Sequence, residues 1–179
     1  MIITISGTPG SGKSTVGSLL SKKLKCGYYD IGKIRRAIAK KREMTLEEYN
    51  RFGESDESTD KEVDDYQREL GKSKDNIVLV SRLGYHFVPN SFKVFLKVNL
   101  EEAAKRIMKD PTRSKEEKPK TLKDALRMIE ARNASDKNRY KKYYGINPYE
   151  NKHYDLIIDT YGKSPAEIVD EILKATKNF

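Results

Sequence analysis

The chain has 179 residues, of which 36% are hydrophobic and 35% are charged, and its formal net charge is +9. This length suits one compact domain with its own core, and the composition argues against a disordered chain. The single cysteine, Cys26, excludes an intrachain disulfide and has no cysteine or histidine beside it to suggest a zinc site. No apolar run is long enough for a signal peptide or a membrane span, so we expect a soluble, cytoplasmic protein.

The positive charge has two interpretations. It could mark a protein that binds nucleic acid or an anionic membrane, or a pocket that holds several phosphate groups beside a solvated, lysine-rich surface. Lysines are scattered along the whole chain, so charge alone does not separate the two. We expect no membrane partner, we do not expect nucleic acid to be the main partner, and we expect a monomer.

Apolar runs alternate with helical periodicities along the chain. Strands are predicted over residues 1–6, 27–31, 77–80, 92–98 and 154–159. Helices are predicted over residues 14–24, 33–42 and 100–109, and from capping residues at Thr45, Ser58 or Thr59, Thr121 and Ser164. This alternation predicts an α/β fold, in which a parallel sheet is joined by right-handed crossovers.

The strongest motif follows the first predicted strand and reads Gly7-Thr8-Pro9-Gly10-Ser11-Gly12-Lys13-Ser14. It matches the phosphate-binding pattern G-x-x-x-x-G-K-[ST] in full, and its glycines let backbone N–H groups point inward. We expect Lys13 to reach the β- and γ-phosphates of ATP and the Ser14 hydroxyl to ligate Mg²⁺. Thr15 either lends its hydroxyl to a phosphate or packs in the helix.

This motif indicates a nucleoside triphosphate but not a particular reaction. A GTPase needs N-K-x-D, whereas Asn151-Lys152 continues with His153 and Tyr154. A P-loop ATPase usually has an acid at the end of an apolar strand, whereas the strand at 77–80 is followed by Ser81 and Arg82. The rest of the chain must therefore identify the reaction.

Three further motifs resemble those of cytidylate kinases, especially the archaeal type. Residues 29–36 read Tyr-Asp-Ile-Gly-Lys-Ile-Arg-Arg, residues 80–82 are similar to an acidic-Gly-Arg strand end, and residues 132–139 reproduce R-x-x-x-D-x-x-R. The resemblance spans nearly the whole chain. It implies transfer of the γ-phosphoryl group of ATP to a nucleoside monophosphate, with CMP or dCMP as first choice.

Arginines suit this reaction because the guanidinium group grips phosphate oxygens bidentately and stays charged. The resemblance implies that Arg36 and Arg82 hold the acceptor phosphate and that Arg106 contacts the phosphates of ATP. Arg132 and Arg139 lie two helical turns apart, so we expect both to point at the reacting phosphates. The predicted catalytic residues are Lys13, Arg82, Arg132 and Arg139.

Asp136 shares the helix face of Arg132 and Arg139. The resemblance implies that it helps to recognise the cytosine amino group, and the alternative is an ion-pair partner for the two arginines. Arg35 is interpreted as a surface neighbour. The predicted acceptor-binding residues are Asp30, Gly32, Arg36, Arg82, Arg132, Asp136 and Arg139.

The chain departs from the archaeal pattern at Lys33 and Val80, where acids are usual. In related kinases, carboxylates near these points orient water on Mg²⁺. Either Asp30 replaces them, or the metal rests on Ser14, phosphates and water alone. Ser81 stands where a glycine is usual, which is expected to narrow the acceptor pocket.

We therefore predict a single domain with a P-loop NTPase-type, three-layer fold and a five-stranded parallel sheet in the order 2-3-1-4-5. Residues 32–73 would form a helical acceptor-binding insert, and residues 109–121, which include Arg113, a lid that excludes water. Residues 161–163 would hold the adenine by backbone contacts. The alternatives are another acceptor, such as AMP, UMP or shikimate, and a nucleotide-binding, RNA-associated regulatory module with weak transfer activity.

Overall fold

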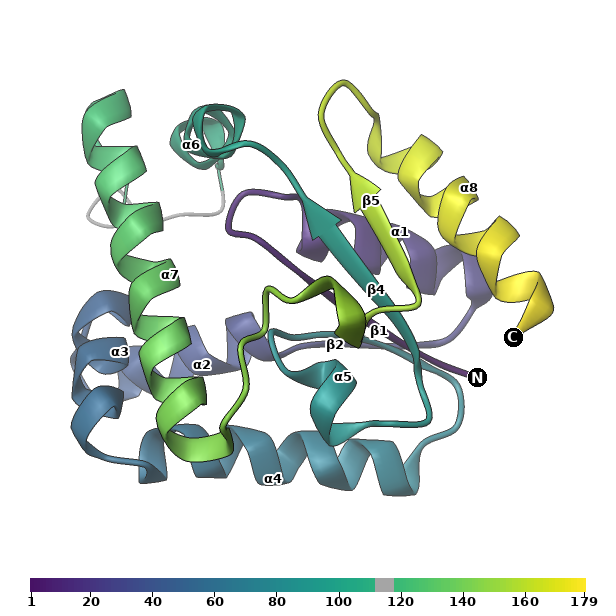
Figure 1. Cartoon of the computed structure of the whole chain (residues 1–179), viewed down its shortest axis with the longest axis horizontal. Helices are drawn as coiled ribbons and strands as arrows, with labels where there is room; N and C mark the ends of the chain where they lie inside the picture. Colours follow the sequence, from purple (N-terminus) through teal and green to yellow (C-terminus); the bar gives the residue numbers. More distant parts are fainter. Residues whose placement is uncertain (112–117) are drawn as a thin grey trace.

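The centre of the molecule is a parallel sheet of five strands in the order β2-β3-β1-β4-β5, as predicted (Figure 1). The computed structural model describes residues 1–111 and 118–179. The strands are β1 (Ile2–Gly7), β2 (Gly27–Asp30), β3 (Ile77–Val80), β4 (Phe92–Lys97) and β5 (Leu156–Asp159). Ile5 pairs with Val80 and Gly7 with Leu96, so the carboxyl ends of the three central strands lie together.

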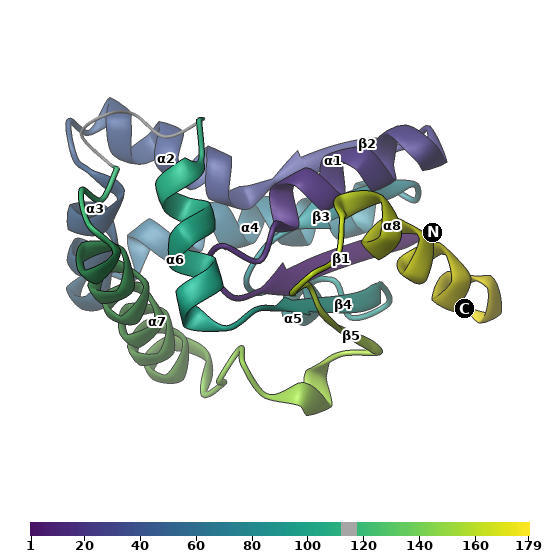
Figure 2. The ribbon, with the colours of Figure 1, turned by 90° about the horizontal axis from the view of Figure 1, so that it is seen from above.

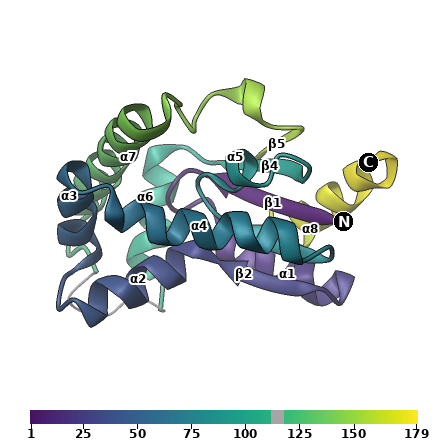
Figure 3. The same ribbon diagram turned by 90° about the horizontal axis from the view of Figure 1, so that it is seen from below.

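Helices cover both faces of the sheet. On one face lie α1 (Lys13–Leu24) and α8 (Pro165–Ala175), and on the other lie α4 (Ser58–Ser73) and the short α5 (Gly84–Phe87) (Figure 3). Leu20 and Ile172 pack in the apolar cluster of the first face, and Leu70 and Leu79 in that of the second. Burying each such side chain contributes about 1.5–3 kcal/mol, so these clusters fix the helices on the sheet.

The remaining long helices gather beyond the carboxyl ends of the strands (Figure 2). They are α2 (Ile31–Lys41), α3 (Leu46–Ser55), α6 (Leu100–Lys109) and α7 (Leu122–Tyr144), and two short 3₁₀ helices, η1 (Asn151–His153) and η2 (Thr176–Asn178), lie elsewhere. Ligands of open α/β sheets bind outside the carboxyl ends of the strands. This end of the molecule is therefore where the site is to be sought.

Helix capping follows the sequence with one exception. Capping boxes confirm the predicted N-caps of α3, α7 and α8 at Thr45, Thr121 and Ser164. The predicted cap at Ser58 or Thr59 is wrong, because α4 already begins at Ser58. The Asp56 carboxylate accepts from the Ser58 N–H instead. The short α5 was not predicted, since one helical turn carries no periodic signal.

The predicted insert at 32–73 contains most of α2 and all of α3 and α4. The predicted lid at 109–121 lies partly outside the described residues, and Arg113 is among those not described. Across residues 1–111 and 118–179, no helix combines the length and apolar character needed to cross a membrane.

Candidate active site

A cavity of about 1170 Å³ opens at the carboxyl end of the sheet and reaches from the glycine-rich loop to α4. The structure brings almost all the predicted site residues to its wall; only Gly7 and Thr8 do not border it. Those that do are Pro9, Gly10, Ser11, Gly12, Lys13, Ser14, Thr15, Asp30, Gly32, Arg36, Arg82, Arg106, Arg132, Asp136 and Arg139. Predicted ATP-side and acceptor-side residues thus face one space.

The start of α1 is built to receive an anion. Its N-cap, Gly12, has φ 86°, and the helix has neither a capping side chain nor an acid in its first turn. Gly10 has φ 73°, and a Cβ there would lie 2.7 Å from the Ala103 carbonyl oxygen. Helices α2, α3, α6, α7 and α8 are capped by side chains, and α4 carries Asp60 in its first turn. Among these long helices of the described chain, the first turn of α1 is thus the one left open for phosphate.

Lys13 curls over the glycine-rich loop. Its Nζ donates to the Thr8 carbonyl oxygen at 2.6 Å and to Ser11 Oγ at 3.4 Å. Burial, and then the charges of Arg82 and Arg132, hold the pKa of Lys13 well below its usual value. An anion placed here would favour the ammonium form, so the loop, the lysine and the arginines together form a cationic cradle.

Oxygen donors lie close to the start of α1. The Tyr28 hydroxyl is 3.0 Å from the Ser14 carbonyl oxygen and 3.1 Å from Asp30 Oδ2. Asp30 is 7% exposed and also accepts from the Lys33 N–H. The Ser14 hydroxyl and the buried carboxylate of Asp30 are the kinds of oxygen group that suit Mg²⁺, which prefers oxygen ligands and usually keeps several waters. Among the described residues, no group of three acids, histidines or cysteines forms a cage for a metal.

Lys33 and Val80 stand at the two positions where acids are usual, and neither can replace a carboxylate. Lys33 is exposed, and its ammonium group lies 5.6 Å from the centre of the Tyr28 ring. Val80 belongs to the apolar cluster under α1, and a Cβ at Gly17 would come within 2.4 Å of Val80 Cγ2. Asp30 lies near Ser14, since both contact the Tyr28 hydroxyl, and its part in orienting water on Mg²⁺ stays a prediction.

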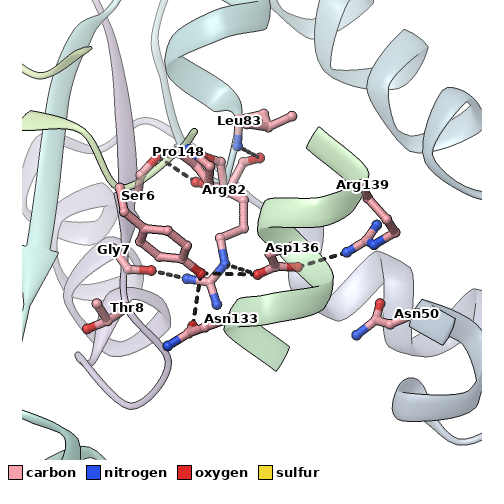
Figure 4. Close-up of polar contacts among 12 residues, drawn as sticks. Ser6, Gly7, Thr8, Asn50, Arg82, Leu83, Asn133, Asp136, Arg139 and Pro148 are labelled. Carbon is pink, nitrogen blue, oxygen red and sulfur yellow. Dashed lines mark hydrogen bonds and ion pairs between the residues drawn. The ribbon is translucent and has the colours of Figure 1, made fainter. Parts of the chain in front are cut away.

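A row of alternating charges crosses the cavity wall (Figure 4). Arg82 donates to the Gly7 carbonyl oxygen and, at 2.8 Å, to Asp136 Oδ2. Arg139 donates to Asp136 Oδ1 at 2.8 Å and to both oxygens of Asp60 at 2.5 and 2.6 Å. We call these four residues, Arg82, Asp136, Arg139 and Asp60, the charge chain. It ties the glycine-rich loop to α7 and α4.

Within this chain, Asp136 pairs with arginines, as the alternative interpretation of this residue expected. Burial opposes its ionisation, but Arg82, Arg139 and Arg132 together hold the pKa of Asp136 below its usual value. Arg82, which the sequence did not indicate as a partner of Asp136, donates to its second oxygen. Recognition of a base by Asp136 stays a prediction.

Arg139 lies on the far side of Asp136 from Gly7 and Thr8 (Figure 4). Its side chain is 1% exposed and is held by two carboxylates. It therefore lies toward the α4 end of the cavity, where its two terminal nitrogens are engaged by Asp60 and Asp136. Its contact with the reacting phosphates stays a prediction, as does the one expected of Arg132.

Two other arginines have partners that the sequence did not indicate. Arg106 donates to Glu102 at 2.8 Å and to the hydroxyl and carbonyl oxygens of Thr160 at 2.9 Å each. It is thus tied to the loop after β5, and its contact with ATP stays a prediction. The interpretation of Arg35 as a surface neighbour is wrong: its side chain is 11% exposed and donates to Asn50 and Asp60.

Sequence reasoning missed a polar face on α4. Asp60, Asp64 and Gln67 are buried and line the cavity together with Val63. Their spacing of three and four residues is that of one helix face, which also carries Leu70. The sequence signal for this polar face is that Asp60, Asp64 and Gln67 share one side of the helix with the apolar residues Val63 and Leu70. Ser81, expected to narrow the pocket, also lines the cavity and donates to Gln67 Oε1.

Asp64 should make stability depend on pH. Burial raises its pKa to about 7, so the folded protein keeps this proton between about pH 4 and pH 7 where the unfolded chain has lost it. Its contribution to stability therefore falls as pH rises through that range. The Asp64→Asn variant, measured by urea unfolding, should gain about 2–3 kcal/mol relative to wild type between pH 5 and pH 8. A difference that is the same at both pH values would contradict this.

Comparison with known proteins gives the chain its relatives. Residues 2–161 match the Cytidylate kinase-like family. A cytidylate kinase from Methanococcoides burtonii is 36% identical over 177 residues, 98% of this chain and 96% of that protein. One from Methanothrix thermoacetophila is 41% identical over 160 residues, 89% of this chain and 88% of that protein.

Two other similar proteins differ more from the chain: the first has a different name from the cytidylate kinases, and the second has a low sequence identity. An S-adenosylmethionine-dependent nucleotide dehydratase from Lacinutrix mariniflava is 35% identical over 173 residues, 96% of this chain but only 35% of that protein. A shikimate kinase structure from Bacteroides thetaiotaomicron aligns with a TM-score of 0.66 at 15% identity, covering 99% of this chain and 98% of that one. At that identity the structural likeness shows the fold alone.

Proposed function

Because the chain belongs to the cytidylate kinase-like family and is a nucleotide kinase, we propose that ATP is its phosphoryl donor and CMP or dCMP its acceptor. The observation that carries the proposal is the single cavity that joins the cationic cradle at Lys13 to the arginines of the acceptor side. The similarity to proteins named cytidylate kinase supports the choice of base.

This phosphoryl transfer requires the two substrates to be held in position by positively charged groups. ATP and a monophosphate repel each other, so cations must neutralise both before an in-line approach. Lys13 would hold the β- and γ-phosphates, and Arg36 and Arg82 the acceptor phosphate. An acceptor phosphate oxygen bonds to the γ-phosphorus as the bond to the β–γ bridging oxygen breaks, and ADP leaves. No general base is required, because the acceptor oxygen is already an anion.

Mg²⁺ would be held by the Ser14 hydroxyl and the ATP phosphates, with Asp30 orienting its water ligands. The ion would supply neutralisation of the phosphate charge. Residues 32–73 would bind the acceptor, and residues 109–121 would exclude water from the closed site. That the protein acts as a monomer in the cytoplasm stays a prediction.

A panel of acceptors tests the proposal. With ATP and Mg²⁺, ADP formation is measured in a coupled assay with CMP, dCMP, UMP, AMP and shikimate. We expect the highest kcat/KM with CMP or dCMP. Higher values with UMP, AMP or shikimate would reassign the acceptor. Tight, salt-dependent RNA binding without ADP formation from any acceptor would favour the RNA-associated module that the net charge of +9 allows.

A further inference from the structure

Asp64 is a buried carboxyl group in the wall of the cavity, on the α4 face, and its bonded partners are neutral. It is 5% exposed and borders the cavity. The Tyr144 hydroxyl donates to Oδ2, and Gln67 Nε2 donates to Oδ1 at 2.9 Å. Gln67 in turn accepts from the Ser81 hydroxyl through Oε1. We call Asp64, Gln67, Ser81 and Tyr144 the Asp64 group.

The neighbouring carboxylates are neutralised, and Asp64 is not. Asp60 pairs with Arg35 and Arg139, and Asp136 pairs with Arg82 and Arg139. In residues 1–111 and 118–179, no lysine or arginine nitrogen forms an ion pair with Asp64. Burying a carboxyl group without a cation costs free energy, and such groups are enriched at functional sites.

The Asp64 group has hydrogen-bonding capacity to spare. Each carboxylate oxygen can accept two hydrogen bonds, and each accepts one here. Burial raises the pKa of Asp64 to about 7, so the carboxylate, which only accepts hydrogen bonds, is the main form above about pH 7. Unmet acceptors in the wall of the cavity fit a ligand that carries an amine.

The group lies where the base of an acceptor would reach. Ser81 directly precedes Arg82, which is predicted to hold the acceptor phosphate, so the Asp64 group begins beside that phosphate and extends along α4. The edge of cytosine carries an exocyclic amine that donates. Uracil presents a carbonyl oxygen at that position, which a carboxylate repels. Adenine also carries an amine but is larger.

We propose that Asp64 determines acceptor specificity by accepting a hydrogen bond from the exocyclic amine of the base, so that CMP is selected over UMP. This inference rests on the proposed function and deepens it. The same amine was expected to meet Asp136, but the partners of Asp136 are the charged guanidinium groups of Arg82 and Arg139, whereas those of Asp64 are neutral. A purely structural Asp64 would tie α4 to α7 through Tyr144 and would not distinguish bases.

A cycle that removes the carboxyl group and the amine in turn tests the proposal. Wild type and Asp64→Ala are compared with CMP, UMP and the 2-pyrimidinone nucleoside monophosphate, which lacks the amine. Affinity is measured by titration calorimetry, which needs no turnover, and kcat/KM by ADP formation. Wild type should prefer CMP about 10- to 100-fold over both others, and Asp64→Ala should lose that preference while its affinity for ATP is unchanged.

Two further variants keep the test decisive. Asp65→Ala changes an exposed neighbour on α4 and should keep the full preference for CMP. If Asp64→Ala does not fold, Asp64→Asn serves, because its amide can donate to a uracil carbonyl and should lower the CMP-to-UMP ratio by a similar factor.

The possible failures are distinguishable. If wild type phosphorylates CMP and the Asp64 variants keep its preference, this inference alone is overturned and Asp64 is structural. If wild type binds CMP and the analogue without the amine equally well, the inference is also overturned. If wild type neither binds nor phosphorylates any monophosphate, the proposed function fails with it.

Discussion

The Lys13→Ala variant is expected to keep its fold and to transfer phosphate at least about 10²- to 10³-fold more slowly than wild type. Lys13 is the ammonium group inside the cradle, and its hydrogen bonds reach only the loop itself, at Thr8 and Ser11. Because burial lowers its pKa, removing it relieves an unfavourable charge and should not unfold the protein. CDP formation measures the rate, and circular dichroism checks the fold.

Lys22→Ala is the matched control, because Lys22 is an exposed lysine on the same helix, α1. Its activity should equal that of wild type. If Lys13→Ala kept wild-type activity, the glycine-rich loop would not be the phosphate cradle.

The second large effect is on stability. Asp136→Ala should lower the free energy of unfolding by about 3–5 kcal/mol, because it leaves the buried guanidinium groups of Arg82 and Arg139 short of a carboxylate. The side chains involved are 11% exposed or less. The pKa of Asp136 is lowered in the folded protein, so this contribution is present above about pH 4 and is lost as pH falls further. Urea unfolding at neutral pH measures it.

Asp170→Ala provides the comparison. Asp170 pairs with Lys23 at 2.5 Å, but both side chains are more than half exposed, and exposed ion pairs contribute little. No clear change in stability is expected. If Asp136→Ala were as stable as wild type and lost only its affinity for CMP, the charge chain would not be structural and Asp136 would be the reader of the base.

The parts of the fold that were predictable have local causes. The strands are short β-branched or apolar runs, and the glycine-rich motif fixes the first strand–loop–helix unit, so the sheet and its order could be predicted. The α5 turn could not, because four residues give no period. The start of α4 was misplaced because Ser58 and Thr59 are both good caps, whereas Asp56 takes the Ser58 N–H.

The candidate site, like the fold, has one part that could be predicted from the sequence and one part that could not. The residues around Lys13 belong to one contiguous loop, so the sequence alone predicts that they lie together at the cavity wall. Apart from the local pair of Asp136 and Arg139, the partners in the charge chain come from distant segments: Arg82 meets Asp136, 54 positions away, and Arg139 meets Asp60, 79 positions away. Such pairings depend on how α4 and α7 pack, which no local pattern contains. For the same reason the ion pair of Arg35 with Asp60, 25 positions away, could not be predicted from the sequence.

The fate of a labelled γ-phosphate tests the central claim most directly. Wild-type protein is mixed with Mg²⁺, CMP and ATP labelled in its γ-phosphate, and the products are separated. Direct transfer across one cavity predicts that the label appears in the β-position of CDP, with one ADP formed for each CDP. Label found only in inorganic phosphate, or ADP formed at the same rate without CMP, would contradict the account.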